Sequence, residues 1–454
     1  MKRTKIICTI GPASSTKKTI EEMIKAGMDV ARFNMSHGSF ESHKQLIDTV
    51  KAARDELGAP VSILIDTKGP EIRVGEFENG FVTLAKGQSF DLLAKRVVGS
   101  QDKCYVSYAK LPELLKNGTQ ILVDDGKIEL KVVGTESGVV HTKVVVGGKL
   151  SNTKSVNIPS CDLNMPYVSA YDERTIEFAC KVGADYVAIS FVRTAGDVKK
   201  IAKLLKKYGG ENIKIISKIE SRLGTENIDE ILHVSDGLMV ARGDLGVEID
   251  FAKIPIIQKQ ILDACTSAGK LSVVATQMLE SMTTGSRPTR AEISDVANSV
   301  LDGTCAVMLS GETSVGEHPV LATATMAKIV EEAEHGNEPN NISYCNPDGL
   351  TIRDAMAYGA YSLLYASKAD AIVCMYDITA DNVSDFSPNK HIFFFTTSKI
   401  EFNQSALLRG VVPILTKSKL GYDKCIEFLK NNNYVKSNST IVTLCKDTIK
   451  LEKL

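Results

Sequence analysis

Short apolar runs alternate with helix-like segments along the first 335 residues. The runs are rich in β-branched side chains, which is typical of buried strands. There are eight of them: Lys5–Ile10, Asp29–Asn34, Ser62–Asp66, Asp185–Phe191, Lys214–Ile219, Gly237–Ala241, Ser272–Ala275 and Ala306–Leu309. A segment with helical periodicity follows each run, sooner or later. Because eight strand–helix units are the number that closes a parallel barrel, the pattern predicts an α/β fold of the (β/α)8 TIM-barrel type.

The connection after the third predicted strand departs from this alternation of strands and helices. After Asp66 the chain passes through Gly69-Pro70 into about a hundred residues of different character, far beyond ordinary loop lengths. Apolar and polar residues alternate there with a period of two, in segments 81–84, 121–133 and 139–148. Asp-Gly and Gly-Gly turns accompany these segments, so we expect a small inserted β domain, barrel-like and built from hairpins, here called the lid domain. The turn Asp124-Asp125-Gly126 fits a hairpin better than a functional site.

The pattern changes again from about residue 335. A helix-like stretch over 354–368 precedes apolar runs at 371–376, 391–397, 411–415 and 440–444, with amphipathic segments between them. This order predicts a third, C-terminal domain with an open α/β sheet. The expected boundaries are 1–70 and 167–335 for the two parts of the barrel, 71–166 for the lid and 336–454 for the C-terminal domain.

Composition excludes several classes of function. The chain has 454 residues with 54 Lys and Arg against 55 Asp and Glu, so its net charge of -1 gives no basic surface for nucleic acid. No window reaches transmembrane length, and the apolar run before Gly11-Pro12 is too short for a signal-peptide core. The ten cysteines never form a Cys-x-x-Cys pair. We therefore expect reduced thiols in a cytoplasmic protein that binds neither membranes nor nucleic acid.

Polar side chains follow six of the eight predicted barrel strands. In a closed parallel barrel the carboxyl ends of the strands form the catalytic face, so these side chains should converge on one mouth. The polar strand ends are the segments 32–37, 66–68, 218–220, 242–244, 276–277 and 310–312. Isolated ion pairs on a barrel rim would also explain each segment taken alone. Taken together, the six ends predict an active site.

The charges at these strand ends indicate a particular chemistry. Glu220 and Asp244 supply two carboxylates, which are too few for a calcium cage but usual for a Mg²⁺ that keeps waters and binds substrate oxygens. Arg32 and Lys218 supply positive charge, and Arg suits a phosphate fork while Lys acts as a point charge. A metal ion flanked by cationic side chains is suited to phosphoryl transfer or to binding a phosphorylated carboxylic acid.

A second cluster offers oxygen atoms of lower charge. Asn34, Ser36, Asp66 and Thr67 supply carbonyl, hydroxyl and carboxylate oxygens with one formal charge among them. Such ligands suit a monovalent cation better than a transition metal, but an ordinary hydrogen-bond network would use the same residues. The chain contains neither a Gly-x-x-x-x-Gly-Lys-Ser/Thr loop nor a strand-linked Gly-x-Gly-x-x-Gly, so any nucleotide is held without those loops.

The motifs along the barrel resemble those of the pyruvate kinase family. They read TIGPAS at 9–14, ARFNMSHG at 31–38, DTKGPEIR at 66–73, ISKIE at 216–220, MVARGDLG at 239–246, ATQMLESM at 275–282, RPTRAE at 287–292 and MLSGET at 308–313. They span the whole barrel, whereas the lid and the C-terminal domain resemble the family mainly in layout. The resemblance implies transfer of the phosphoryl group of phosphoenolpyruvate to ADP, giving ATP and pyruvate, with Mg²⁺ and K⁺ as cofactors and a homotetrameric assembly.

The resemblance also implies roles for single residues. Lys218 stabilises the moving phosphoryl group, and Arg32 binds phosphate. Glu220 and Asp244 hold Mg²⁺, and Gly243, Asp244 and Thr276 meet the carboxylate end of the substrate. Thr276 and Ser310 lie near the route of the proton. The potassium ligands are Asn34, Ser36, Asp66 and Thr67, and the nucleotide contacts are Asn34, His37 and Arg73. Glu71 is the residue that accompanies potassium dependence in this family.

Three departures from the family pattern limit the inference. Tyr171 stands where the family has a lysine near the nucleotide, which leaves nucleotide preference open. Residues 377–382 replace the family's Thr-x-Ser-Gly turn that holds the phosphate of an effector. We also expect no Gly-rich loop and no terminal strand after Leu444, so an effector site is absent or altered. Two other functions stay open: a Mg²⁺-dependent lyase or aldolase acting through a pyruvate enolate, and a catalytically silent metabolite sensor.

Overall fold

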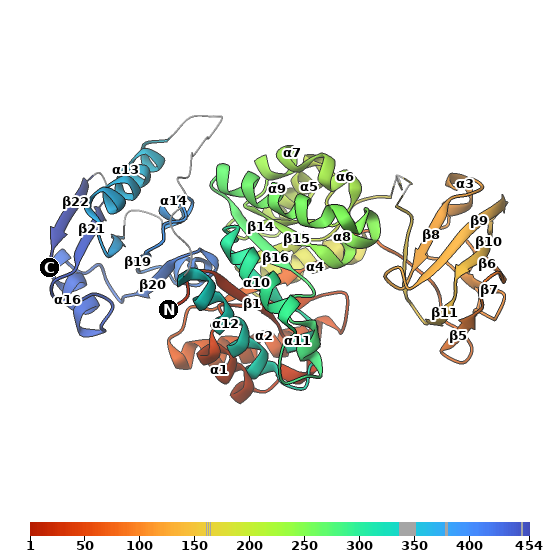
Figure 1. The fold of residues 1–454 in the computed structure, drawn as a ribbon, viewed down its shortest axis with the longest axis horizontal. Coiled ribbons are helices and arrows are strands. Elements are labelled where there is room, and N and C mark those ends of the chain that lie inside the picture. Colours follow the sequence, from red (N-terminus) through yellow and green to blue (C-terminus); the bar gives the residue numbers. More distant parts are fainter. Residues whose placement is uncertain (160, 162, 164, 336–350, 377–379, 446–447) are drawn as a thin grey trace.

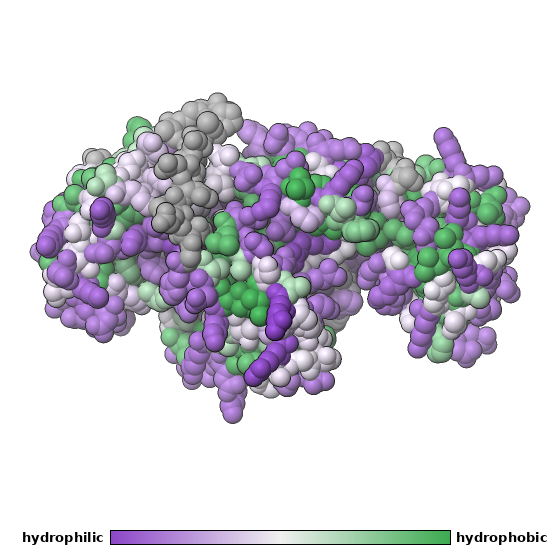
Figure 2. All heavy atoms as spheres, viewed as in Figure 1, coloured by the Kyte–Doolittle hydropathy of each residue, from purple (hydrophilic) through white to green (hydrophobic). Residues whose placement is uncertain are grey.

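The computed structural model of the chain forms three bodies in a row, with the barrel in the middle (Figure 1). The structure describes residues 1–159, 161, 163, 165–335, 351–376, 380–445 and 448–454. The lid domain lies at one end of the row and the C-terminal domain at the other. Hydrophilic residues cover most of the face drawn in Figure 2, and apolar residues come to the surface in smaller patches.

The eight predicted runs form a closed parallel barrel, as the pattern predicts. Around the ring the strand order is β1-β17-β16-β15-β14-β13-β3-β2. The strand bounds are β1 Lys5–Thr9, β2 Val30–Asn34, β3 Ser62–Asp66, β13 Tyr186–Ile189, β14 Lys214–Ile219, β15 Gly237–Ala241, β16 Leu271–Ala275 and β17 Ala306–Leu309. These strands are buried almost throughout, because parallel strands in a barrel are covered on both faces.

The two faces of each barrel strand serve different cores. Successive strand residues point to opposite sides, so in β1 Ile6 and Cys8 belong to the core under the outer helices, whereas Ile7 belongs to the barrel interior. The interior core continues through Leu64 and Met239 into the C-terminal domain. This double burial explains why the strands read as continuous apolar runs rather than as alternating ones.

Helices surround the barrel and several begin at clear sequence signals. Their bounds are α1 Lys17–Ala26, α2 Phe40–Leu57, α4 Ala170–Lys181, α5 Ala195–Lys207, α6 Arg222–Glu226, α7 Ile228–His233, α8 Arg242–Glu248, α9 Ile254–Ser267, α10 Arg290–Leu301, α11 Gly311–Ser314 and α12 Pro319–His335. Capping boxes begin α4 at Ser169 and α10 at Thr289, where side chain and backbone satisfy each other's hydrogen bonds.

The lid is a mixed sheet with a core of its own. Its strands are β4 Ile72–Arg73, β5 Phe81–Leu84, β6 Ser89–Leu93, β7 Lys103–Tyr105, β8 Gln120–Val123, β9 Ile128–Glu136, β10 Val139–Val146, β11 Gly148–Ser151 and β12 Ser155–Asn157, with one short helix, α3 Leu111–Leu114. Seven strands form one sheet, and β11 and β5 form a second. The residues Asp124, Asp125 and Gly126 make the β8–β9 turn with positive φ angles, as expected for a tight hairpin.

The C-terminal domain is an open sheet in the order β20-β19-β18-β21-β22. Its elements are α13 Ile352–Ser367, β18 Ala371–Cys374, α14 Asp381–Ser384, β19 His391–Thr396, α15 Lys399–Gln404, β20 Val411–Leu415, α16 Tyr422–Asn431, β21 Thr440–Cys445 and β22 Thr448–Lys453. The expectation that no terminal strand follows Leu444 is wrong, because β22 pairs antiparallel with β21 from Cys445↔Thr448 to Thr440↔Lys453. The predicted departure at 377–382 lies partly outside the described residues.

The C-terminal domain closes the floor of the barrel, opposite the mouth. The Ser62 hydroxyl donates to the carbonyl of Asn403 at 2.6 Å, and the Tyr186 hydroxyl donates to the carbonyl of Gln404 at 2.8 Å. Buried Lys5 donates to the carbonyl of Val411 at 2.7 Å. The amino ends of the strands are thus used for stability, which leaves the carboxyl ends for function. No described helix has both the length and the apolar character that a membrane crossing needs.

Candidate active site

The polar strand ends converge at the barrel mouth around Lys218, which β14 carries near its carboxyl end. The Lys218 ammonium donates to the hydroxyl of Ser190 at 2.8 Å. It also lies 3.1 Å from Asp66 Oδ1 and 2.9 Å from Glu220 Oε1. Burial alone would lower the pKa of Lys218, but the charges of Asp66 and Glu220 outweigh it and raise the pKa. The group therefore stays cationic in a site from which water is largely excluded.

Arg32 adds a second cation beside the first. Its Nε donates to Asp66 Oδ2 at 2.7 Å and its Nη1 donates to the Thr9 hydroxyl at 2.7 Å. Burial pushes the pKa of Asp66 upward, but Lys218 and Arg32 together hold that pKa below its usual value. Asp66 is thus an ionised carboxylate that fixes both cations at the mouth.

The two predicted magnesium ligands form an acid pair next to Lys218. Glu220 is fully buried, and its Oε2 accepts a hydrogen bond from the backbone N–H of Phe191 at 2.7 Å. Burial raises the pKa of both Glu220 and Asp244; the charge of Lys218 opposes this effect, and negative charges nearby add to it. Glu220 Oε1 lies close to Lys218 as an ion pair but lacks hydrogen-bond geometry. A cation that binds both carboxylates would stabilise the acid pair of Glu220 and Asp244.

The donor set fits a divalent ion that keeps part of its water shell. Among the described residues no three His, Cys, Asp or Glu side chains gather into a cage that could hold a metal alone. Two carboxylates with one under-satisfied buried oxygen match the one or two ligands that Mg²⁺ usually takes from a protein. The remaining positions would fall to substrate oxygens and water.

Gly243 and Thr276 meet at the neighbouring strand ends. The backbone N–H of Gly243 donates to Thr276 Oγ1 at 2.8 Å, and the Thr276 hydroxyl donates to the carbonyl of Ala275 at 2.6 Å. Thr276 and Gln277 have φ angles of 69° and 55°, the left-handed region that costs energy for residues other than glycine. Backbone strain of this kind gathers at functional sites, where surrounding contacts hold it in place.

Arg242 does not join the mouth, although it belongs to a polar strand end. Its Nη1 donates to Asp295 of α10 at 2.7 Å, and its Nη2 donates to the carbonyl of Thr276 at 2.6 Å. Arg242 therefore supports the strained turn from behind. Ser310 follows β17, and its buried hydroxyl has no hydrogen-bond partner among the described residues. Glu312 fixes the Ser310 backbone by accepting its N–H at 2.7 Å.

The predicted potassium ligands lie together at the ends of β2 and β3. Asn34 Oδ1 accepts the backbone N–H of Ser36 at 3.1 Å. The Ser190 hydroxyl donates to the carbonyl of Thr67 at 2.6 Å, and the Ser190 backbone N–H donates to Thr67 Oγ1 at 3.1 Å. Asp66 already binds two cations of the protein itself. The four residues are thus neighbours, with oxygen atoms that are partly engaged in hydrogen bonds.

The predicted nucleotide contacts lie on the side of the mouth where the lid begins. Arg73 forms a fork with Glu71, from Nε to Oε1 at 2.7 Å and from Nη2 to Oε2 at 2.8 Å, and its Nη1 donates to the carbonyl of Thr153 at 2.7 Å. Lys68 lies 3.2 Å from the same Glu71. Partial burial and the charge of Arg73 lower the pKa of His37, which keeps the ring neutral.

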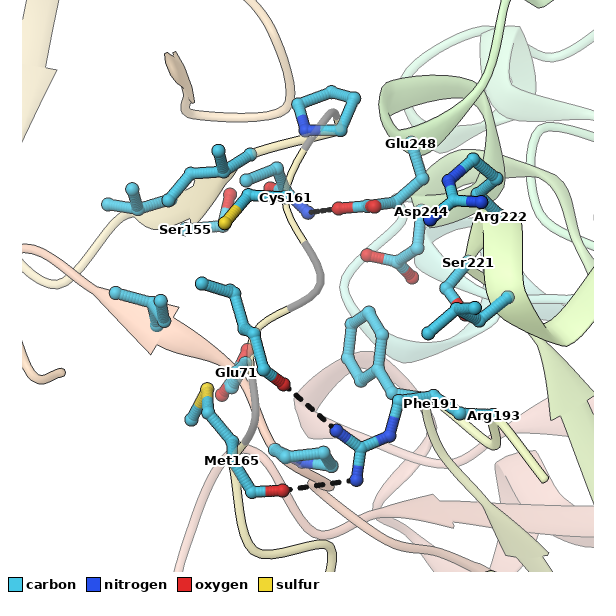
Figure 3. A pocket seen from close by; sticks show the side chains of 18 residues that line it. Glu71, Ser155, Cys161, Met165, Phe191, Arg193, Ser221, Arg222, Asp244 and Glu248 are labelled. Carbon is cyan, nitrogen blue, oxygen red and sulfur yellow. Dashed lines mark hydrogen bonds between the residues drawn. The ribbon is translucent and has the colours of Figure 1, made fainter. Parts of the chain in front are cut away.

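A cleft between the lid and the barrel opens onto Asp244 (Figure 3). The lid contacts the barrel there through Asn157, whose side-chain amide donates to Glu248 at 2.9 Å. Arg193 fastens the returning linker by donating to the carbonyls of Leu163 and Met165, each at 3.1 Å. The cleft is therefore bounded on one side by catalytic-face residues and on the other by a separately folded lid.

Two residues of the site were not predicted from the sequence. Ser190 follows β13 and contacts Lys218, Asp66 and Thr67; Thr9 ends β1 and contacts Arg32. Both follow the rule used for the other six strands, since a polar side chain stands where the strand ends. They were missed because the predicted strands ran to Ile10 and Phe191, whereas β1 ends at Thr9 and β13 ends at Ile189.

A lidded parallel barrel with a buried ammonium, an arginine and an acid pair at its mouth defines an enzyme of the phosphotransferase class. The chain matches the family profile "Pyruvate kinase, barrel domain" over residues 1–323 and the profile "Pyruvate kinase, alpha/beta domain" over residues 354–452. The chain therefore belongs to the pyruvate kinase family.

Individual relatives agree with the family match. A pyruvate kinase of Sporosarcina psychrophila is 43% identical over 437 residues, covering 94% of this chain and 74% of the relative. A pyruvate kinase of Clostridium acetobutylicum is 41% identical over 431 residues, covering 92% and 89%. The crystal structure of a pyruvate kinase from Cryptosporidium parvum superposes with a TM-score of 0.93 at 32% identity, covering 100% of this chain and 96% of the other.

Proposed function

We propose that the barrel mouth transfers the phosphoryl group of phosphoenolpyruvate to ADP, giving ATP and pyruvate, with Mg²⁺ and K⁺ as cofactors. The observation that carries the proposal is the buried Lys218 ammonium, held between Asp66 and Glu220 and next to Asp244. Catalysis of phosphoryl transfer depends mainly on positioning and on stabilisation of charge, and this arrangement supplies fixed positive charge in a site from which water is largely excluded.

Lys218 and Arg32 act on the phosphoryl group. The ammonium stabilises the negative charge that spreads over the phosphoryl oxygens during transfer, and the arginine fork binds those oxygens before transfer. Asp66 holds both cations by direct ion pairs, so little reorganisation is needed when the substrate arrives. Lys218 and Arg32 are both more than nine-tenths buried, so little water reaches them.

Glu220 and Asp244 hold the Mg²⁺ in this proposal. When bound, the ion screens the negative charge of phosphoryl and carboxylate oxygens that would otherwise repel the incoming nucleotide. Asn34, Ser36, Asp66 and Thr67 are proposed to bind K⁺. Glu71, which accompanies potassium dependence in the family, is engaged by Arg73 and Lys68, so a lysine at that position would replace an acid by a cation next to two others.

After the phosphoryl group has left, the enolate of pyruvate must take up a proton at its methylene carbon. We assign Thr276 and Ser310 to the route of that proton, and Gly243, Asp244 and Thr276 to the carboxylate end of the substrate. The Thr276 hydroxyl lies within a hydrogen bond of the Gly243 N–H, and the Ser310 hydroxyl is buried without a partner among the described residues. His37, Arg73 and Asn34 are proposed to contact the nucleotide as the lid closes.

Steady-state kinetics tests the proposal. Pyruvate formation from phosphoenolpyruvate is measured with ADP, Mg²⁺ and K⁺ and with each of them omitted in turn, and we expect turnover only when ADP and Mg²⁺ are present and a strong fall without K⁺. Turnover without ADP would favour the lyase or aldolase alternative. Tight metabolite binding by calorimetry with no turnover under any combination would favour the metabolite sensor.

Further features of the chain extend the proposal. We infer a homotetramer in the cytoplasm from membership of the family, and we keep the domain boundaries at residues 70/71, 166/167 and 335/336. The closed barrel, the separate lid core and a second core confined to the C-terminal domain support these divisions, although the barrel interior also packs against that domain. Sedimentation of the full chain would test the assembly, and limited proteolysis would test the boundaries.

A further inference from the structure

The loop between β2 and α2, residues 35–39, is held at two of its carbonyls. The Tyr171 hydroxyl donates to the carbonyl of Met35 at 2.7 Å, and Nε2 of His43 donates to the carbonyl of His37 at 2.6 Å. The backbone N–H of Met35 donates to the carbonyl of Asp66 at 3.0 Å. The loop is therefore fixed from β3, from its own helix α2 and from α4, which carries Tyr171.

The ring of Tyr171 is itself held in place. It packs on Phe40 with a centroid distance of 5.3 Å and an interplanar angle of 33°. Phe40 in turn packs on Phe178 at 5.3 Å, and the Arg174 guanidinium lies 5.0 Å from the Phe40 ring centre. This aromatic packing gives the hydroxyl a defined direction, since the phenol has few rotamers once its ring is enclosed.

Met35 lies between two residues of the proposed potassium site. Asn34 ends β2 and Ser36 follows Met35, so the Met35 carbonyl belongs to the peptide that joins the two halves of the cluster. Without the Tyr171 hydroxyl this part-buried carbonyl loses its donor, and the peptide is free to turn toward water or toward a cation. Either movement displaces the Asn34 and Ser36 oxygens, and it also displaces His37, which follows directly.

We propose that Tyr171 is a positioning residue that sets the affinity of the site for the monovalent cation and for the nucleotide, by fixing the Met35 carbonyl and with it the loop 35–39. The inference rests on the proposed function of the same site. Tyr171 acts through hydrogen bonding and packing and needs no charge.

The chemistry of a phenol suits this task. A lysine at the same place on α4 would bring an ammonium, which is strongly hydrated and carried on a flexible stem. The Tyr171 ring buries apolar surface against Phe40 and presents one neutral donor. Burial raises the pKa of Tyr171, so its hydroxyl remains a donor throughout the neutral range. The chain thus uses position 171 to order the backbone of the loop.

The variant Tyr171→Phe tests the proposal, because it removes the hydroxyl and keeps the ring on Phe40. Tyr208→Phe is the matched control, since the Tyr208 hydroxyl donates to Glu173 of the same α4 at 2.9 Å but does not reach the loop. Both variants and the parent are titrated with KCl at constant ionic strength, with tetramethylammonium chloride as the balancing salt. The kcat and the KM values for ADP and phosphoenolpyruvate are measured at saturating K⁺.

For Tyr171→Phe we expect the half-activating K⁺ concentration and the KM for ADP to rise about two- to tenfold, the range of a neutral hydrogen bond. The KM for phosphoenolpyruvate and the kcat at saturation stay within about twofold, because Lys218, Arg32 and the acid pair are untouched. Two measurements do not depend on turnover: calorimetric binding of Mg·ADP, and the rise of Tm with KCl relative to tetramethylammonium chloride. Both weaken in Tyr171→Phe and match the parent in Tyr208→Phe.

The inference is overturned if Tyr171→Phe matches the parent in K⁺ and ADP titrations, or if Tyr208→Phe shifts them equally, since a general loss of packing would then explain the effect. It is also overturned if only the KM for phosphoenolpyruvate or the kcat changes. If the parent enzyme turns over without any response to K⁺, the claim that Tyr171 sets the affinity for a monovalent cation is wrong. A parent that never turns over defeats the proposed function, whereas the calorimetric comparison still decides the role of Tyr171.

Discussion

The chain builds one closed parallel sheet and one open sheet in which four of the five strands run parallel, and in the closed sheet charged side chains from different strand ends meet in one cluster. In the barrel, Asp66 ends β3, while Glu220 and Asp244 follow the ends of β14 and β15. In the C-terminal domain the parallel strands β18 and β19 end in Cys374 and Thr396, which are uncharged. The two sheets share their strand direction and their buried apolar character, so these properties alone do not make a catalytic site.

The two sheets differ in that the barrel sheet is closed and the C-terminal sheet is open. In the barrel β1 pairs with β17, so the strand ends lie on a ring and face a common mouth. In the C-terminal domain the ends lie along an edge, with β20 and β22 at its two limits. A ring lets one ammonium touch Asp66 of β3 and Glu220 after β14, although the two residues are far apart in sequence. Convergence of the strand ends, more than their composition, therefore creates the site.

The largest effect is expected from breaking the charge cluster at the ring. In Lys218→Met the phosphoryl oxygens lose their fixed cation, and we expect kcat to fall about 10²–10³-fold, as for other transition-state charge contacts. The matched control is Tyr376→Phe at the open sheet, whose hydroxyl contacts Thr416 at 3.0 Å and accepts the Leu420 N–H at 2.9 Å. Its kcat should stay within about twofold of the parent.

Steady-state kinetics at saturating Mg²⁺, K⁺ and both substrates measures this contrast. A kcat for Lys218→Met within about tenfold of the parent would show that the ring does not concentrate the catalytic charge. Circular dichroism and Tm control for folding, because Met keeps the apolar stem of the lysine but leaves Asp66 and Glu220 without their partner.

A smaller effect is expected from removing one charge of the acid pair. Glu220→Gln keeps the shape of the side chain and halves the negative charge offered to Mg²⁺, so we expect the half-activating Mg²⁺ concentration to rise about 10- to 100-fold. Glu334→Gln is the control, since Glu334 is a buried carboxylate at the floor of the barrel that accepts the N–H groups of Arg3 and Thr4. Equal Mg²⁺ responses in both variants would contradict the assignment of Glu220.

The smallest effect concerns stability and arises where the open sheet meets the barrel floor. Burial, together with the charges of Lys5, the N-terminus and Arg3, lowers the pKa of His391 from 6.5 to about 4, against an opposing pull from Glu334. The unfolded chain therefore binds the proton first as the pH falls, and stability that is complete above pH 6.5 is lost between pH 6.5 and 4. From pH 7 to pH 5 this one group should cost about 2 kcal/mol of unfolding free energy.

Thermal and urea unfolding of the parent and of His391→Gln at pH 5, 6 and 7 measure this effect. The variant cannot take up the proton, so its stability should depend less on pH than that of the parent over the same range. Identical pH slopes for the two proteins would show that His391 does not carry the acid sensitivity of this interface.

The sequence predicts the barrel well because its strands are buried on both faces and keep their apolar runs wherever they stand. The terminal strand β22 escaped prediction because it lies at the edge of the open sheet. Its residues Thr448, Lys450 and Glu452 are polar, and its pattern is mostly exposed. An edge strand buries little apolar surface, so its sequence lacks the apolar pattern by which the other strands were predicted.

The charged residues of the site were predictable for a different reason. Each charged strand end could be an isolated ion pair, but six polar ends on one rim of a predicted barrel together identified Lys218, Glu220 and Asp244. Ser190 and Thr9 were missed because the predicted strands extended past them, to Phe191 and Ile10. Nor does the sequence show that Arg242 turns toward Asp295 or that Tyr171 binds the Met35 carbonyl, because these contacts join segments far apart in the chain whose mutual positions depend on the packing of the whole barrel.

The lid is inserted between two strands, β3 and β13, that pair directly with each other in the ring. Tyr186 pairs with Leu64, Val187 with Ile65 and Ala188 with Asp66, as directly as if no residue separated the two strands. The pairing of these two strands therefore does not depend on the lid domain that the chain inserts between them. Protein engineers can therefore shorten or exchange the insertion that begins after Asp66 while the strands of the ring keep their pairing.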